Sequence, residues 1–225
     1  MLLKKGLKIQ TKKSNTMILG SHDTMSYLPP KHRWMIPFRF MAQCQRENYA
    51  EQYKDGARYF DLRIYFDKDG AVLFKHGLMK FKHSFMLPTS MLMHLDSIGR
   101  CTVRLILELD TLEMKFMSKK SIEFQEKMFK NYCKDVENTF RNITFNGGRR
   151  KGGWEVLYKF KTPDAPLMDM YSSMQGSKIN GLWPWRWAKK YNQKIYNNNI
   201  YSDKPGFLLM DFIDSLIVPM SSTTI

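Results

Sequence analysis

Short apolar runs, separated by amphipathic segments, are the feature of this sequence that most constrains its fold. Runs rich in apolar and β-favouring residues predict strands over 17–19, 57–65, 71–75, 103–109, 154–160, 177–182 and 206–212. Helical periodicity or capping residues predict helices over 43–54, 89–98 and 121–140. Apolar strands separated by helices are typical of a mostly parallel sheet covered by helices. The predicted class is therefore α/β, and because the last of these segments is again an apolar strand, we expect a closed or nearly closed (β/α) barrel.

The expected organisation is a single domain over residues 1–225. The chain contains neither an internal repeat nor a linker long enough to divide it. Its hydrophobic fraction of 43% and charged fraction of 25% are ordinary for a globular protein. A turn signal at 67–70 joins the second and third predicted strands, and Asn146-Gly147-Gly148 is interpreted as a loop.

The formal charge of +15 is the strongest compositional signal. It implies a negatively charged partner: nucleic acid, anionic lipid head groups or a phosphorylated substrate. Basic pairs are scattered along the chain and are not gathered in one tail, so we expect a basic folded surface. The three cysteines, Cys44, Cys101 and Cys133, fit neither a zinc pattern nor a dense disulfide framework, and we expect reduced or buried thiols.

The sequence shows no membrane span and no secretion signal. No apolar run approaches the roughly 20 residues that cross a bilayer. Residues 1–8 contain lysines without an apolar core or a small-residue cleavage site behind them. The default expectation is a cytoplasmic protein or one that is peripheral to a membrane, and secretion stays open if a leader has been removed.

Histidines and charged residues stand at the ends of several predicted strands, which is where barrel enzymes hold their catalytic groups. These residues are His22, Asp23, Asp61, Arg63, His76, Asp110 and Asp211. First and last strands are neighbours in a closed barrel, so Asp211 can lie beside His22 and orient it as a general base. We take Glu108 and Asp110 to lie on opposite faces of their strand, and we favour Asp110, nearer the C-terminal end, as the inward one. The other histidines lack such neighbours and are expected to be structural.

Three of these segments together resemble a known family. The sequences GSHDT at 20–24, GARYFDLR at 56–63 and HG at 76–77 resemble the X-region of phosphatidylinositol-specific phospholipases C, most closely the bacterial, metal-independent branch. GFLLMDF at 206–212 is similar to the final strand of that branch. The resemblance covers about residues 17–77 and 205–213, and it implies a distorted, incompletely closed TIM-type (β/α) barrel.

The resemblance also implies a role for each candidate catalytic residue. His22 would be the general base that takes the proton from the inositol 2-hydroxyl, and Asp211 would orient it. The hydroxyl oxygen would attack the adjacent phosphorus, giving inositol 1,2-cyclic phosphate and diacylglycerol. His76, helped by Asp23, would be the general acid on the leaving oxygen. Arg63 would neutralise the phosphate.

No metal and no cofactor are expected, although a residual calcium site formed by Asp23, Asp61 and Asp110 stays open. Metal-dependent relatives hold calcium with carboxylates, and one of these stands at the position of Arg63, whose guanidinium supplies a permanent positive charge instead. Candidate substrate-binding residues are Asp61, Asp110, Lys159 (or Lys161) and Tyr201 (or Trp183). Because Asp110 stands where the bacterial pattern has a basic residue, head-group specificity stays open.

The expected partner is phosphatidylinositol or a related phospholipid at a membrane surface. Tryptophans at 183, 185 and 187 stand beside Arg186, Lys189 and Lys190, a combination that favours an anionic membrane interface, although the tryptophans could equally pack the interior. No nucleic-acid motif appears, so we expect no nucleic-acid partner, and no obligate protein partner is evident. The alternatives are the same scaffold acting on another phosphodiester, such as a glycosylphosphatidylinositol anchor, a lysophospholipid or a glycerophosphodiester, and a non-catalytic module that binds anionic lipid.

Overall fold

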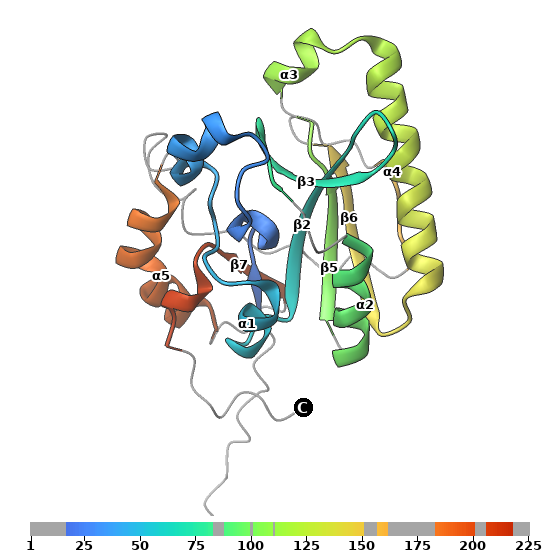
Figure 1. Ribbon diagram of the computed structural model, residues 1–225. Coiled ribbons are helices and arrows are strands. Elements are labelled where there is room, and N and C mark those ends of the chain that lie inside the picture. Colours follow the sequence, from blue (N-terminus) through green and yellow to red (C-terminus); the bar gives the residue numbers. More distant parts are fainter. Residues whose placement is uncertain are drawn as a thin grey trace, which may run out of the picture.

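The computed structural model describes residues 17–82, 88–99, 101–109, 111–150, 157–161, 183–200 and 206–217. Within them the chain forms one mixed β-sheet flanked by helices, so the predicted α/β class is confirmed (Figure 1). The strands are β1 (Met17–Ser21), β2 (Tyr59–Phe66), β3 (Val72–His76), β4 (Met79–Lys80), β5 (Cys101–Leu107), β6 (Ile143–Arg150) and β7 (Gly206–Met210). The α-helices are α1 (Tyr49–Lys54), α2 (Pro88–Ile98), α3 (Thr111–Phe116), α4 (Lys119–Thr139) and α5 (Pro184–Ile200), and the 3-10 helices are η1 (Thr24–Tyr27), η2 (Arg33–Met41) and η4 (Ile213–Ser215).

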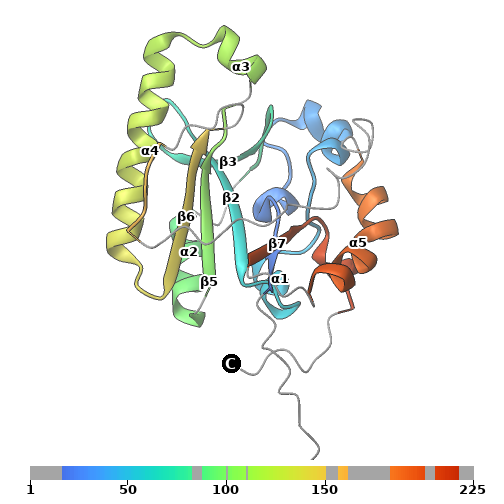
Figure 2. The ribbon, with the colours of Figure 1, turned by 180° about the vertical axis from the view of Figure 1, so that it is seen from behind.

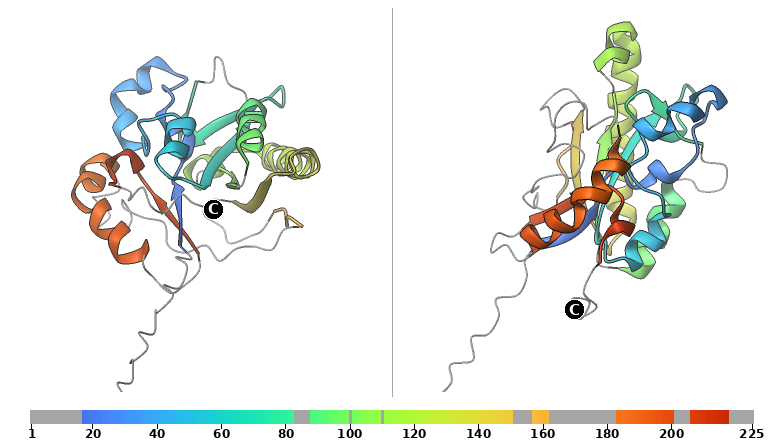
Figure 3. Two further views of the ribbon diagram at one scale, coloured as in Figure 1. Left: turned by 90° about the horizontal axis from the view of Figure 1, so that it is seen from below. Right: turned by 90° about the vertical axis from the view of Figure 1, so that its left-hand side faces the viewer.

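The parallel part of the sheet has the strand order β7–β1–β2–β5–β6. Helices α2 and α4 lie beside β2, β5 and β6, whereas α5 lies beside β7 (Figures 1 and 2). Figure 3 shows α4 and α5 on opposite sides of the molecule. No strand joins β6 to β7 among the residues that the structure describes, so a closed barrel is not shown there. None of the described helices is both long enough and apolar enough to span a membrane.

The hairpin β2–β3 departs from the parallel arrangement and brings His76 back toward the end of β1. Ile64 pairs with Leu107 of β5 and with Phe74 of β3, so β5 and β3 lie on opposite edges of β2. The edge that β3 occupies is the one on which β1 pairs with Tyr59 and Phe60. Strand β3 therefore continues this edge where β1 stops, and it runs back toward β1.

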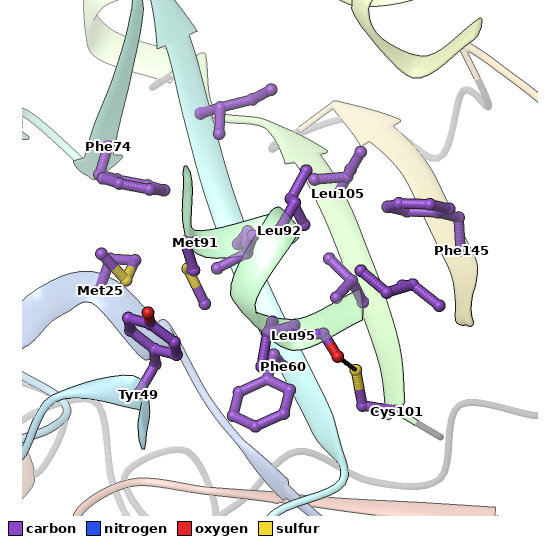
Figure 4. Close-up of a cluster of buried hydrophobic side chains, with 14 of the residues drawn as sticks. Met25, Tyr49, Phe60, Phe74, Met91, Leu92, Leu95, Cys101, Leu105 and Phe145 are labelled. Carbon is purple, nitrogen blue, oxygen red and sulfur yellow. Dashed lines mark hydrogen bonds between the residues drawn. The ribbon is translucent and has the colours of Figure 1, made fainter. Parts of the chain in front are cut away.

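The two faces of the sheet differ in chemistry because successive strand residues point to opposite sides. Phe60, Leu62 and Ile64 belong to the main apolar core, which includes residues of α2 and α4. Figure 4 shows Met91 and Leu92 of α2 packed among side chains of the neighbouring strands. The intervening β2 residues Asp61 and Arg63 are buried on the other face, where they meet Arg104 of β5 and Glu108, which directly follows β5.

Strand β6 corrects the loop predicted at 146–148. The stretch Asn146-Gly147-Gly148 is part of a strand and not a loop, and it pairs in parallel with β5 through a bulge. Gly147 has φ of 102°, and a Cβ there would lie 2.5 Å from the carbonyl oxygen of Leu105. This glycine therefore permits a close approach of two strands and does not mark a turn.

Other boundaries shift for local reasons. The strand predicted over 154–160 is wrong for 157–160, which are irregular, while 154–156 and the strand predicted over 177–182 lie outside the described residues. Helix α1 begins only at Tyr49, because Asn48 caps it by accepting hydrogen bonds from the backbone N–H groups of Ala50 and Glu51. The three cysteines are free and buried, as predicted.

Candidate active site

The first pair of candidate catalytic residues comes from the pairing of β1 with β7. Ser21 lies opposite Met210 in this parallel pair, so His22 and Asp211 leave the two strands side by side. The backbone N–H of His22 donates to the carbonyl of Met210 at 3.0 Å. Both strands then turn sharply, because Asp23 and Phe212 have positive φ values of 42° and 48°. These turns leave the two side chains together at the C-terminal end of the sheet.

His22 and Asp211 form a buried pair in which the tautomer is defined by the partners. His22 Nδ1 lies 2.5 Å from Asp211 Oδ1, and since a carboxylate only accepts, Nδ1 carries the proton. On the other side of the ring, Arg63 Nη2 lies 2.6 Å from His22 Nε2 and donates to it. Nε2 therefore carries the lone pair, and this is the nitrogen with which His22 could accept a proton as a general base.

Arg63 is held by buried carboxylates. Its Nε donates to Asp61 Oδ2 at 3.1 Å, and its Nη1 lies 3.8 Å from Glu108 Oε2. Burial would lower the pKa of Arg63, but Asp61 and Glu108 raise it above its ordinary value. Burial would raise the pKa of Asp61, but Arg63 and Arg104 outweigh it and lower that pKa to about 2. The guanidinium and the Asp61 carboxylate are thus both ionised at neutral pH.

His76 makes the second histidine–aspartate pair. Its Nδ1 lies 3.0 Å from Asp23 Oδ2 and 2.8 Å from the carbonyl oxygen of Ala42, which requires a proton on Nδ1. Burial would lower the pKa of His76, but the charge of Asp23 and the hydrogen bond to it raise that pKa. The ring of His76 meets the ring of His22 edge to face, with 6.0 Å between the centroids. An imidazole that holds its proton thus faces one that can accept a proton.

Buried side-chain amides hold the backbone of these turns in place. Gln45 Nε2 donates to the carbonyls of His22 (3.0 Å) and Met210 (2.8 Å), and so links the ends of β1 and β7. Asn192 of α5 donates to the carbonyl of Asp211 at 2.6 Å. Gln52 of α1 donates to the carbonyl of Thr24 at 3.0 Å. The site is therefore supported from three separate segments of the chain.

Six of the predicted site residues lie together: His22, Asp23, Asp61, Arg63, His76 and Asp211. Asp110 and Tyr201 lie outside the described residues. Lys159 is exposed and apart from the cluster: its neighbour Tyr158 donates to Glu137 near the end of α4, which leads into the opposite end of β6. The structure therefore does not bring Lys159 to the site.

Glu108 is a site residue that our preference for Asp110 overlooked. Its carboxylate is buried against Arg63, and Oε1 accepts from the backbone N–H of Gly77 at 2.9 Å. Residues two apart in a strand share a face, so strand geometry gave no reason to place Glu108 and Asp110 on opposite faces. Arg104 was missed as well, although charged residues at alternate positions of an apolar run were a signal for both.

The rim near His76 carries exposed apolar side chains. None of the nine residues of η2 is buried, although most of them are apolar. Phe40 of η2 stacks on Trp183, which is 46% exposed, with ring centroids 5.8 Å apart. Trp185 and Trp187, in contrast, are half-buried and pack on Phe212 and Tyr191, respectively. Of the three tryptophans only Trp183 therefore belongs to an exposed surface.

Comparison with known proteins shows the fold. No protein-family model matches the sequence, and no curated protein matches it either. The structure resembles phosphatidylinositol-specific phospholipase C from Listeria monocytogenes, with 17% identity, coverage of 91% of this chain and 92% of that chain, and a TM-score of 0.54. Two mutant forms of the same phospholipase from Staphylococcus aureus give 16% identity, 91% and 93% coverage and a TM-score of 0.53, and 15% identity, 87% and 85% coverage and a TM-score of 0.56. The chain thus shares the fold of the bacterial phosphatidylinositol-specific phospholipases C.

Proposed function

We propose that this protein is a metal-independent phosphodiesterase that cleaves phosphatidylinositol-type lipids by intramolecular attack of the inositol 2-hydroxyl. The observation that carries the proposal is the facing arrangement of two histidine–aspartate pairs, His22–Asp211 and Asp23–His76, next to the buried Arg63. An acid, a base and a fixed cation are what cleavage of a phosphodiester by a neighbouring hydroxyl requires.

In this mechanism His22 accepts the proton of the 2-hydroxyl at Nε2 while Asp211 stabilises the imidazolium that forms. The oxygen then attacks phosphorus, and the bond from phosphorus to the glycerol oxygen breaks. His76, whose pKa Asp23 raises, donates a proton to that leaving oxygen. The products are inositol 1,2-cyclic phosphate and diacylglycerol. Attack from within the same molecule brings a high effective molarity, so the protein itself needs few groups.

Arg63 changes its partner during this reaction. It donates to His22 Nε2 at 2.6 Å, so a substrate hydroxyl must take over this position while the guanidinium turns toward the phosphate oxygens. There it stabilises the negative charge of the transition state in a buried site. A permanent cation held by Asp61 and Glu108 supplies the charge that calcium supplies in metal-dependent relatives, which supports a reaction without metal.

The surface around the site suits a substrate that is embedded in a membrane. The exposed apolar side chains of η2 directly precede Ala42 in the sequence, and the carbonyl of Ala42 contacts His76. Trp183 adds to this exposed surface by stacking on Phe40 of η2. The formal charge of +15 favours anionic lipid head groups. Apolar side chains that enter the interface next to the acid would give the site access to a head group without extracting the lipid.

The test is phosphorus NMR of the purified protein with phosphatidylinositol vesicles in the presence of a chelator. We expect the signal of a five-membered cyclic phosphate, and we expect His22→Ala and His76→Ala to lower its rate of appearance by orders of magnitude. His94→Ala is the matched control, because His94 bonds to Tyr49 outside the site. Full activity of either site variant would refute the mechanism, and strong inhibition by the chelator would refute its independence from metal.

The same experiment separates the alternatives. A glycosylphosphatidylinositol anchor shares the inositol phosphodiester, so its cleavage with the same cyclic product would broaden the substrate class and leave the chemistry unchanged. Release of glycerol phosphate from a glycerophosphodiester, with phosphatidylinositol left intact, would replace the proposed substrate.

A further inference from the structure

Cys44 is a buried thiol between the two histidine–aspartate pairs, and the mechanism above does not use it. Its Sγ lies 3.7 Å from His76 Nδ1. Its backbone is fixed, since Cys44 N–H donates to Ser26 Oγ at 2.9 Å and its carbonyl accepts from Phe212 N–H at 2.6 Å. The thiol therefore lies next to the candidate acid because of its backbone hydrogen bonds and not because of a flexible side chain.

We propose that Asp23, Cys44 and His76 form a binding site for a soft divalent cation of the zinc class, and that the bound ion blocks catalysis. The potential ligand atoms, a carboxylate oxygen, Sγ and Nδ1, all lie within 4.8 Å of one another. The binding site stands by itself, and only the loss of activity rests on the proposed function.

The distances fit one ion with three ligands. Zinc bonds of about 2.0–2.3 Å at tetrahedral angles place ligand atoms ~3.3–3.6 Å apart. The observed separations are 3.7 Å from Cys44 Sγ to His76 Nδ1 and 3.0 Å from Asp23 Oδ2 to the same nitrogen. Both separations lie within a few tenths of an ångström of the tetrahedral values, and the third, between the Asp23 carboxylate and Cys44 Sγ, is within 4.8 Å. Asp23 Oδ2 is buried and, apart from its ion pair with His76, has no hydrogen-bond partner in the described part of the chain.

A second group, His22, Cys44 and Asp211, shares the thiol but fits less well. His22 Nδ1 and Asp211 Oδ1 are 2.5 Å apart, too close for two ligands of one tetrahedral ion without rearrangement. The group around His76 is also the more accessible one, because the His76 side chain is 18% exposed whereas that of His22 is 8% exposed.

The donor set selects the kind of metal. Calcium and magnesium take oxygen ligands, with six to eight for calcium. One thiolate, one imidazole and one carboxylate suit zinc or a similar transition metal instead. The proposed zinc site therefore differs in its ligands from the calcium site of metal-dependent relatives. In this protein Arg63 takes the place of that calcium ion as the source of positive charge.

Local charge allows a cation to enter although Arg63 is near. The carboxylates of Asp23, Asp61, Glu108 and Asp211 lie around two guanidinium groups, those of Arg63 and Arg104. Four carboxylates against two guanidinium groups leave the surroundings net negative, even when His76 carries a third positive charge. On binding the ion, the thiol releases its proton to the solvent, since a bound cation of this kind stabilises the thiolate form of its sulfur ligand.

Bound at Nδ1, the ion would displace the proton that His76 directs at Asp23 and Ala42. A metal-bound imidazole no longer becomes an imidazolium, because its ligating nitrogen must stay deprotonated. The general acid would then be lost while the fold stays intact. Zinc would therefore act as an inhibitor and not as a cofactor.

The test compares the wild-type protein with Cys44→Ala, and Cys133→Ala is the matched control because it removes another buried thiol, on α4. Zinc affinity is measured by calorimetry, and cobalt(II) serves as a spectroscopic substitute. We expect the wild type and Cys133→Ala to show thiolate-to-cobalt charge transfer and zinc binding at one ion per chain. We expect Cys44→Ala to lose this absorption and to bind zinc at least about 10–100-fold more weakly. Substituting a residue that only supports a metal ligand already costs this much, so the loss of a ligand should cost no less.

Zinc should also inhibit lipid cleavage by the wild type reversibly, and Cys44→Ala should resist it. Equal zinc affinity of the wild type and Cys44→Ala, or no zinc binding by the wild type, would overturn the proposal. If Cys44→Ala does not fold, zinc protection of Cys44 from alkylation in the Cys133→Ala protein decides the question, and unprotected Cys44 counts against the site. Binding and spectra do not require turnover, so a failure of the proposed phosphodiesterase activity remains distinguishable from a failure of the metal site.

Discussion

Asp211→Asn is the substitution that tests the candidate site most directly. It keeps the shape of the side chain and removes the negative charge that lies 2.5 Å from His22 Nδ1. The carbonyl of Asp211 is unaffected, so the hydrogen bond from Asn192 that holds this turn is preserved. The variant should therefore fold, and its thermal unfolding shows whether it does.

The size of the effect follows from the charge that develops on His22. As His22 takes the proton of the attacking hydroxyl it becomes an imidazolium, which the Asp211 carboxylate stabilises. For about 4 Å between the two charge centres and an effective dielectric constant of about 20, the attraction is about 4 kcal/mol. Each 1.4 kcal/mol or so corresponds to a factor of ten in rate, so kcat should fall about 10³-fold. KM should change little, because the charge acts in the transition state.

The assay is the initial rate of cyclic phosphate formation from phosphatidylinositol vesicles, followed over a range of substrate concentrations. Asp214→Asn is the matched control, because it changes the net charge equally but removes only an ion pair with Arg46, which is half-exposed. Its kcat should stay within about threefold of the wild type. A folded Asp211→Asn variant that keeps more than about a tenth of wild-type kcat would refute the orienting role of Asp211.

Other substitutions test neighbouring parts of the argument. In Asp23→Asn the group that raises the pKa of His76 loses its charge, so the alkaline limb of the kcat profile should move to lower pH, and an unmoved limb would contradict the acid role of His76. Gln45→Leu removes the side-chain amide that donates to the buried carbonyls of His22 and Met210. We expect a loss of about 1–3 kcal/mol in the free energy of unfolding by denaturant together with a lower kcat. Unchanged stability and rate would contradict the supporting role of Gln45. In Gly20→Ala the new Cβ would lie 2.6 Å from Leu209 Cδ2. Such overpacking costs about 1–3 kcal/mol, so we expect a lower melting temperature. An unchanged melting temperature would disprove the tight packing at Gly20.

Much of the site was predictable because charged residues interrupt otherwise apolar strands. Asp61 and Arg63 stand two apart in β2, a spacing that places both on one face of a strand, and both are buried. His22 and Asp211 directly follow apolar runs, and neighbouring parallel strands bring such ends together. The resemblance of the surrounding motifs then supplied a role for each residue, and the structure brings these residues close together.

Local signals failed where a residue serves a distant partner. The glycine at Gly147 reads as a loop in the sequence, yet it lets β6 approach β5. The tryptophans of 183–187 divide between exposed and half-buried positions, because Trp183 precedes α5 whereas Trp185 and Trp187 lie within its first turn. Helix α5 itself was not predicted, although Pro184 at its first position is a recognised start signal.

The sequence alone determined the α/β class and the buried character of the strands, because these depend on local composition and on strand periodicity. It also placed His22 and Asp211 at the ends of the first and last apolar runs, whereas the pairing of His76 with Asp23 came from the resemblance of the surrounding motifs. Only the tertiary structure decided which groups surround them. It placed β3 on the edge of β2 where β1 stops, so that His76 meets Asp23, and it directed Glu108 toward Arg63. It also laid Ala42 to Gln45 across the ends of β1 and β7, with Cys44 between the two pairs. Such contacts depend on strand order and on distant backbone hydrogen bonds, which no short segment of the sequence specifies.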